Sequence, residues 1–230
     1  VTLTESSTFA TVTFTSPGTI ASVEINDSNA LDLGALTVAS NLTVTAGGAV
    51  TNSGTLVVPG TATISASGYN VTLNTATNNF GTAVLTGADV SIRDTNAIIL
   101  GASIVSGTYT VTAGGAVTDS GTQEITGVTT ISASSQEVTL NTATNNFADE
   151  VRITGAAITL VDEDAIDLGA STVSGNYTVT AGGNITDSGT VTVGGNLVVT
   201  TDANSGSIDL GDLEVNGTMA LTTDTGGAAT

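Results

Sequence analysis

A thirteen-residue segment recurs three times in this chain at almost constant spacing. It is LTVTAGGAVTNSG from Leu42 to Gly54, YTVTAGGAVTDSG from Tyr109 to Gly121 and YTVTAGGNITDSG from Tyr177 to Gly189. The equivalent residues Ala46, Ala113 and Ala181 follow one another with offsets of 67 and then 68 in residue number. A fixed period of this kind indicates a tandem array in which each unit packs against its neighbours.

Short stretches of alternating apolar and polar residues fill each unit. Between positions 71 and 137 they are VTL (71–73), VSI (90–92), YTVTA (109–113) and TTISA (129–133). Gly, Asn, Asp and Ser separate them, and no helix-length window shows apolar residues at i, i+3, i+4 and i+7. Alternation with a period of two predicts β-strands. We therefore expect an all-β protein.

The spacing of equivalent apolar residues predicts how the strands are arranged. The offset in residue number is 20 from Val111 to Ile131, 22 from Ile131 to Ile153 and 26 from Ile153 to Val179. If each interval is one coil, the chain is a parallel β-helix (β-solenoid) of roughly ten coils of about 20–26 residues, with three coils per 67–68-residue repeat. We expect the coil to be right-handed, because parallel crossovers almost always are.

Two irregularities test this interpretation. The spacing gains one residue at 148–150, which a loop can absorb, and the segment IDLG at 166–169 recurs at 208–211, with an offset of only 42. This offset falls short of the repeat by about the length of one coil, and we interpret it as the loss of one whole coil. Loss of half a coil would be expected to turn the inward residues outward.

The repeat also sets the expected domain organisation. We predict a single β-solenoid array over 1–230, with units at approximately 1–70, 71–137 and 138–206 and a partial unit at 207–230. Val1 falls in the middle of a repeat, because VTLTESSTF resembles VTLNTATNNF from Val71. We therefore expect the chain to be a segment of a longer protein.

Charge limits the possible partners. The formal net charge is −19, because 21 Asp and Glu face two Arg and no Lys. Such a chain lacks the basic surface that nucleic acids or anionic membranes attract. It has no run of 18 apolar residues, so membrane insertion through a helix is not expected.

A D-x-N/D turn recurs once per repeat. The turns are Asp27-Ser28-Asn29, Asp94-Thr95-Asn96 and Asp162-Glu163-Asp164. Carboxylates of this kind can bind Ca²⁺, but Asp and Asn also form turns by hydrogen bonding to their own backbone. We favour the turn and expect no metal or other cofactor. Asp162, Glu163 and Asp164 are the best calcium candidates if one is bound.

Three other repeated patterns have two interpretations each. The Gly pairs at 47–48, 114–115 and 182–183 are expected to be coil corners rather than phosphate loops, since no helix follows them. In the NNF motifs (78–80 and 145–147) we expect Asn to bond turn backbone and Phe to fill the core, rather than to form a ligand-facing patch. Thr-x-Thr (43–45, 110–112 and 178–180) is typical of outward strand residues, although a flat threonine face can also bind ice.

The composition argues against an enzyme. His, Cys and Lys are absent, which removes the usual general base, thiol nucleophile and Schiff-base amine. Asp162 and Asp164 could in principle serve a glycosidase, but their place in a repeated turn favours a structural role. We predict no catalytic or cofactor-binding residues.

The last full repeat carries a family resemblance. AIDLGASTVSGNYTVTAGG (165–183) followed by ITDSGTVTVGG (185–195) resembles the repeats of giant bacterial surface and secreted proteins, the filamentous-haemagglutinin-like adhesins and related extracellular β-strand-repeat proteins. This resemblance implies a secreted, extracellular or cell-surface fibre, stalk or matrix protein in adhesion or biofilm-type assembly.

Such a protein would interact mainly with itself, through a head-to-tail filament or a longer chain, and also with surface carbohydrate or a host or cell-surface protein. The alternative is a carbohydrate- or ice-binding β-solenoid module.

Overall fold

The structure is a computed structural model that describes residues 1–15, 19–202, 206–224 and 226–230. These residues form thirty short strands and no helix, so none of them lies in a helix that could span a membrane. Every strand pairing is parallel, and the strands belong to two large sheets.

The 16-stranded sheet runs the length of the molecule. Its main path is β1 (Thr2–Ser7), β3 (Val23–Asp27), β6 (Leu42–Ala46), β8 (Leu56–Ser65), β10 (Asn79–Gly87), β12 (Ile98–Leu100), β15 (Val117–Asp119), β18 (Val138–Leu140), β21 (Ile158–Asp162), β24 (Tyr177–Ala181), β27 (Leu197–Thr201) and β30 (Met219–Thr222). Branches contain β5 (Leu36–Thr37), β13 (Ser103–Val105), β16 (Gln123–Ile125) and β19 (Asn146–Phe147).

The 14-stranded sheet forms the facing wall. Its main path is β2 (Thr11–Val12), β4 (Leu31–Leu33), β7 (Val50–Asn52), β9 (Val71–Leu73), β11 (Val90–Asp94), β14 (Tyr109–Ala113), β17 (Thr129–Ser132), β20 (Val151–Gly155), β22 (Ile166–Leu168), β25 (Ile185–Asp187) and β28 (Ile208–Asp209). A branch contains β23 (Ser171–Val173), β26 (Val191–Val193) and β29 (Leu213–Val215).

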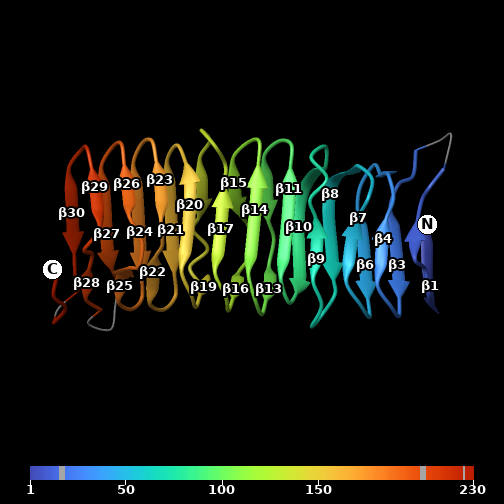
Figure 1. The fold of residues 1–230 in the computed structure, drawn as a ribbon, viewed down its shortest axis with the longest axis horizontal. Helices are drawn as coiled ribbons and strands as arrows, with labels where there is room; N and C mark the ends of the chain where they lie inside the picture. Colours follow the sequence, from blue (N-terminus) through green and yellow to red (C-terminus); the bar gives the residue numbers. More distant parts are fainter. Residues whose placement is uncertain (16–18, 203–205, 225) are drawn as a thin grey trace.

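This arrangement is a parallel β-solenoid of about eleven coils, which confirms the predicted fold. The chain advances steadily along the long axis, with its two termini at opposite ends (Figure 1). At ~4.8 Å between paired strands, eleven coils give a rod about 50 Å long. The right-handed sense of the coil stays a prediction.

The coils are slightly shorter than expected. The step in residue number between paired residues ranges from 17 (Val151 to Leu168) to 23 (Ile185 to Ile208). Val111, Ile131 and Ile153 stack on successive coils as predicted. The interval from Ile153 to Val179 is not one coil, because Val179 lies in the other sheet, where it pairs with Leu160.

One repeat spans about three coils, as predicted. Counting paired residues along a ladder gives a more exact value of about three and a half coils per repeat. Seven steps of one ladder lead from Thr61 to Val198, and two repeats together have about the same length. Equivalent segments of consecutive repeats therefore lie in opposite sheets. Leu42 and Tyr177 are in the 16-stranded sheet, whereas Tyr109 is in the 14-stranded sheet.

Each coil has a long side and a bent side, and the half coil exchanges them. In the middle repeat the long side is one strand of four or five residues (β11, β14 or β17) in the 14-stranded sheet. The bent side is two shorter strands (β12 and β13, for example) in the 16-stranded sheet. In the third repeat the long strands β21, β24 and β27 are in the 16-stranded sheet, and the bent side is in the 14-stranded sheet.

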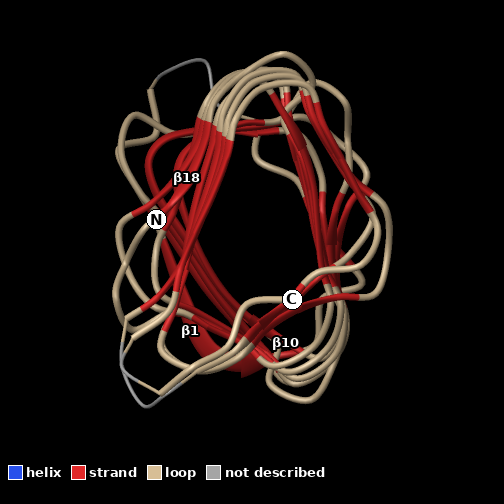
Figure 2. Cartoon of the chain, turned by 90° about the vertical axis from the view of Figure 1, so that its left-hand side faces the viewer, coloured by secondary structure: helices blue, strands red, loops and turns tan. Residues whose placement is uncertain are grey.

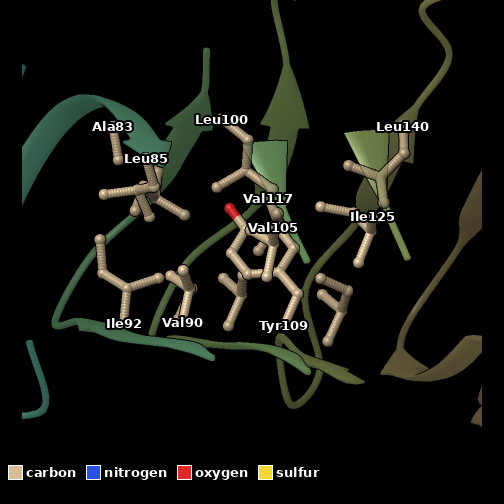
Figure 3. Packing of buried hydrophobic residues seen from close by; sticks show 14 of the residues in the cluster. Ala83, Leu85, Val90, Ile92, Leu100, Val105, Tyr109, Val117, Ile125 and Leu140 are labelled. Carbon is tan, nitrogen blue, oxygen red and sulfur yellow. The ribbon is translucent and has the colours of Figure 1, made fainter. Parts of the chain in front are cut away.

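Both walls contribute alternate residues to one continuous core. Seen end on, the strands of successive coils superimpose around an elongated cross-section (Figure 2). Val90, Ile92 and Tyr109 extend from one wall toward Leu100 and Val117 on the other (Figure 3). Mostly Val, Ile, Leu and Ala fill this space, as the low aromatic content predicts.

This geometry corrects our reasoning about half coils. Because both walls alternate inward and outward residues, a shift of half a coil moves a segment to the opposite wall and keeps its apolar residues inside. The interpretation of the IDLG offset as the loss of one whole coil is corrected as well, because an offset of two coils is about one and a half coils shorter than a repeat of about three and a half. Ile208 lies two steps from Ile166 in one ladder, through Ile185.

Candidate functional site

The recurring Asp turn meets the NNF motif at two repeat junctions and Phe9 at the first. The Asp94 side chain is 2% exposed, and its Oδ2 accepts a hydrogen bond from the Phe80 backbone amide at 2.5 Å. Its Oδ1 accepts another from the Asn96 amide at 2.6 Å, which closes the turn. The Thr95 amide donates to the carbonyl of Asn78 at 2.9 Å, so the turn is stacked directly on the NNF motif.

The same pair of bonds occurs at the other two junctions. Asp162 accepts from the amides of Phe147 and Asp164, both at 2.8 Å. Asp27 accepts from the amides of Phe9 at 2.6 Å and Asn29 at 2.7 Å.

These carboxylates accept backbone hydrogen bonds at positions where no strand of the next coil pairs with the segment. Phe147 ends the two-residue strand β19, and Phe80 lies at the start of β10, just before a register shift; both pair only with the preceding coil, through Ile125 and Val58. The Asp side chain of the next coil therefore takes the place of a strand and satisfies the Phe amide. The Asp turn lies where the long and bent sides of the coil exchange sheets. We call this place the half-coil junction.

The Asn and Phe residues of the NNF motif have the structural roles we predicted. Phe80 and Phe147 are buried in the core. Asn78 is buried, and its Oδ1 accepts from the Leu56 amide while its Nδ2 donates to the carbonyl of Leu73. In the next repeat, the Oδ1 of Asn145 accepts from the Gln123 amide.

The three candidate calcium ligands lie in different environments. Asp162 is buried at 1% exposure, whereas Glu163 and Asp164 are exposed. Burial raises the pKa of Asp162 to about 6, and the nearby charges of Asp164 and Glu163 add to this, although the two backbone hydrogen bonds act in the opposite direction. Within residues 1–15, 19–202, 206–224 and 226–230, no three His, Cys, Asp or Glu side chains are grouped to hold a metal ion.

The Gly pairs are coil corners, as predicted, and the reason is close approach. A Cβ on Gly114 would collide with the carbonyl oxygen of Thr95 on the preceding coil. The amides of Gly114 and Gly115 donate to the carbonyls of Asp94 and Asn96 at 3.0 and 2.8 Å.

Threonine and serine form ordered arrays on the long sides. We name them face 1 (Thr43, Thr45, Thr63 and Ser65), face 2 (Thr110, Thr112, Thr130 and Ser132) and face 3 (Thr159, Thr178, Thr180 and Thr200). These side chains are partly or fully exposed, and within the described residues their hydroxyls have no hydrogen-bond partner. The sequence argument missed that Thr130 and Ser132 continue the Thr-x-Thr array, although TTIS has the same alternation.

Charges are arranged differently on the two sides. The long strands β6, β14, β17, β24 and β27 contain no charged residue. Exposed acidic residues lie mainly on the bent-side strands: Asp32, Asp119, Glu124, Asp167, Asp187, Asp209 and Glu214. The exception on a long strand is Glu24 of β3, which pairs with Thr43 and so borders face 1. Both arginines, Arg93 and Arg152, border face 2, and Arg152 forms an ion pair with Glu150 at 2.5 Å.

Comparison with protein families now identifies the repeat. A family model described as repeats of unknown function (DUF5649) matches residues 20–86, 87–154 and 155–212. The chain belongs to this family. No match was found among curated proteins or solved structures.

The family boundaries coincide with the structural junctions. The first repeat ends at residue 86 within β10, and the second ends at residue 154 within β20. In its sheet, each of these two strands pairs with a long-side strand of the preceding coil and with the two short bent-side strands of the next coil. The first two family repeats therefore end where the coil exchanges its sides, and our units starting at 71 and 138 differ from them in phase.

Proposed function

We propose that this family member is a structural segment of an extracellular or cell-surface bacterial fibre, stalk or matrix protein, which contributes to adhesion or biofilm-type assembly. The observation that carries the proposal is the uninterrupted parallel pairing along the rod. Two sheets of 16 and 14 strands hold each coil to the next, and the described residues around their core form no helix. Extending such a rod requires the backbone hydrogen bonds of both walls between two adjacent coils to break together, which resists tension.

The proposal includes end-to-end stacking of coils, from the same chain or from another copy. Support comes from the parallel pairing of successive coils, in which one coil edge is complementary to the next. We further propose that the segment is not an enzyme, since His, Cys and Lys are absent from the sequence.

Electron microscopy and cell labelling test this function. Fusing a second copy of residues 20–212 in frame should lengthen the purified rod by nearly its own length, with no added flexible density. Antibodies against the segment should label the surface of intact producing cells. Fusions that form separate particles, or labelling only after the cells are permeabilised, would contradict the proposal.

A binding role is the second candidate, because the hydroxyl faces provide repeated unpartnered donors and acceptors. The sequence left carbohydrate and ice open as ligands.

A further inference from the structure

The three hydroxyl faces form regular arrays whose hydroxyls make no hydrogen bond within the part of the chain that the structure describes. Paired residues repeat every ~4.8 Å along the axis, and the two columns of each face are ~6.7 Å apart. Each hydroxyl can donate one hydrogen bond and accept others. A ligand that contacts several of them at once must therefore itself present regularly spaced hydrogen-bonding groups.

The charge distribution narrows the ligand class. Face 2 comprises four uncharged residues, in a chain of net charge −19. A polyanion would be repelled by the surrounding protein, and a polycation would be attracted to the acidic bent sides instead. A neutral polymer is the partner whose charge matches a neutral face.

The arrays also discriminate between a hydroxyl-rich polymer and ice. Face 3 is interrupted by Val198, and face 2 is bordered by Arg93 and Arg152. These interruptions break the continuous lattice that an ice plane requires. A flexible polymer needs only local contacts, and it can bind several faces weakly and add their effects.

The half-coil junction places the faces on opposite sides of the rod. Faces 1 and 3 lie on the 16-stranded sheet, and face 2 lies on the 14-stranded sheet. We propose that the faces bind neutral polysaccharide chains, and that their alternation makes the segment a cross-linker between chains on its two sides. This rests on the proposed role as an extracellular structural protein and adds its ligand class.

Binding and cross-linking can be measured separately with cellulose and chitin. Co-sedimentation with the insoluble polymer reports binding, and bundling of fibrils under the microscope reports cross-linking. The wild-type chain should do both. A variant with Thr110→Glu and Thr112→Glu should still bind through faces 1 and 3 but lose bundling, because only one side remains active.

Two further variants complete the design. Adding Thr43→Glu, Thr45→Glu, Thr178→Glu and Thr180→Glu to the first pair should weaken binding by about tenfold or more. Thr118→Glu with Ile104→Glu adds the same charge as the first pair to the bent side of neighbouring coils, and should preserve binding and bundling. Circular dichroism melting must show that every variant remains folded.

Several outcomes would overturn the proposal. They are no binding to either polymer, bundling that survives Thr110→Glu and Thr112→Glu, or equal loss of bundling in the bent-side control. Thermal hysteresis of ice that disappears with Thr110→Glu and Thr112→Glu would assign the faces to ice. Failure of polymer binding leaves the rod-length and cell-labelling tests of the proposed function unaffected.

Discussion

The carboxylate of Asp162 gives the sharpest test of the junction. We predict that Asp162→Asn destabilises the protein at pH 4 and is nearly neutral at pH 7. The substitution keeps the shape of the side chain. At pH 4 the wild-type carboxyl is protonated, and each of its two oxygens can still accept from one amide, of Phe147 or of Asp164, whereas the carboxamide has only one oxygen. One buried donor then lacks a partner, which costs about 1–3 kcal/mol.

The pH dependence follows from burial. The folded pKa of Asp162, about 6, exceeds its ordinary value of 3.8, so the folded state binds more protons between these values. The wild-type free energy of unfolding therefore falls as the pH rises from about 4 to about 6. The decrease is at most about 3 kcal/mol, because a pKa difference of one between the folded and unfolded states corresponds to about 1.36 kcal/mol. The amide of the variant does not titrate, so the advantage of the wild type over the variant shrinks by this amount.

Urea unfolding of both proteins across pH 4–7 gives this difference, in which the contributions of the other carboxylates cancel. Hydrogen exchange at the Phe147 amide reports the same event locally. Asp164→Asn is the matched control, since it removes one exposed negative charge and no buried hydrogen bond; its effect should change with pH less than that of Asp162→Asn, because burial contributes more than the charge of Asp164 to the raised pKa of Asp162. A wild-type advantage that stays constant or grows toward pH 7 would refute the burial argument.

Three other perturbations have clear expected outcomes. Tyr177→Phe should leave stability unchanged or raise it by about 1–3 kcal/mol in urea unfolding, because it removes a buried hydroxyl that has no hydrogen-bond partner among the described residues; a large loss would show that a partner exists. Gly114→Ala should cost about 1–3 kcal/mol by overpacking against the Thr95 carbonyl, whereas Gly211→Ala, with open space around it, should be tolerated in the same assay. EDTA should leave the melting temperature nearly unchanged, and a fall that Ca²⁺ reverses would make Asp162 a metal ligand.

Much of the fold was predictable because strand and coil periodicity are local properties. The alternation in YTVTA identifies a strand with one buried face, and near-constant spacing between such strands identifies parallel stacking. Val111, Ile131 and Ile153 occupy one ladder as expected.

The half coil was not predictable by the same reasoning. The inward–outward alternation of a strand is identical on either wall, so YTVTA at 109 and at 177 gives no sign that the two copies lie in opposite sheets. The wall is decided by the number of short strands and corners between the copies. Spacing alone counts residues and does not distinguish a corner from a straight segment.

The sequence contained part of the evidence for the contact between the Asp turn and Phe. Both motifs recur once per repeat at a similar separation, from Phe80 to Asp94 and from Phe147 to Asp162. That co-occurrence could have suggested a contact. The physical reason, an amide at the end of a ladder that needs an acceptor, depends on knowing which strand has no successor.

The half-coil offset has a consequence for how repeat number affects geometry. Removing residues 87–154 would rotate everything that follows by half a turn about the rod axis, so that surfaces once on the same side would face in opposite directions. Removing or adding two repeats would restore the original orientation and change only the length. In a rod of this design, orientation depends on whether the number of repeats is odd or even, and reach depends on the number itself.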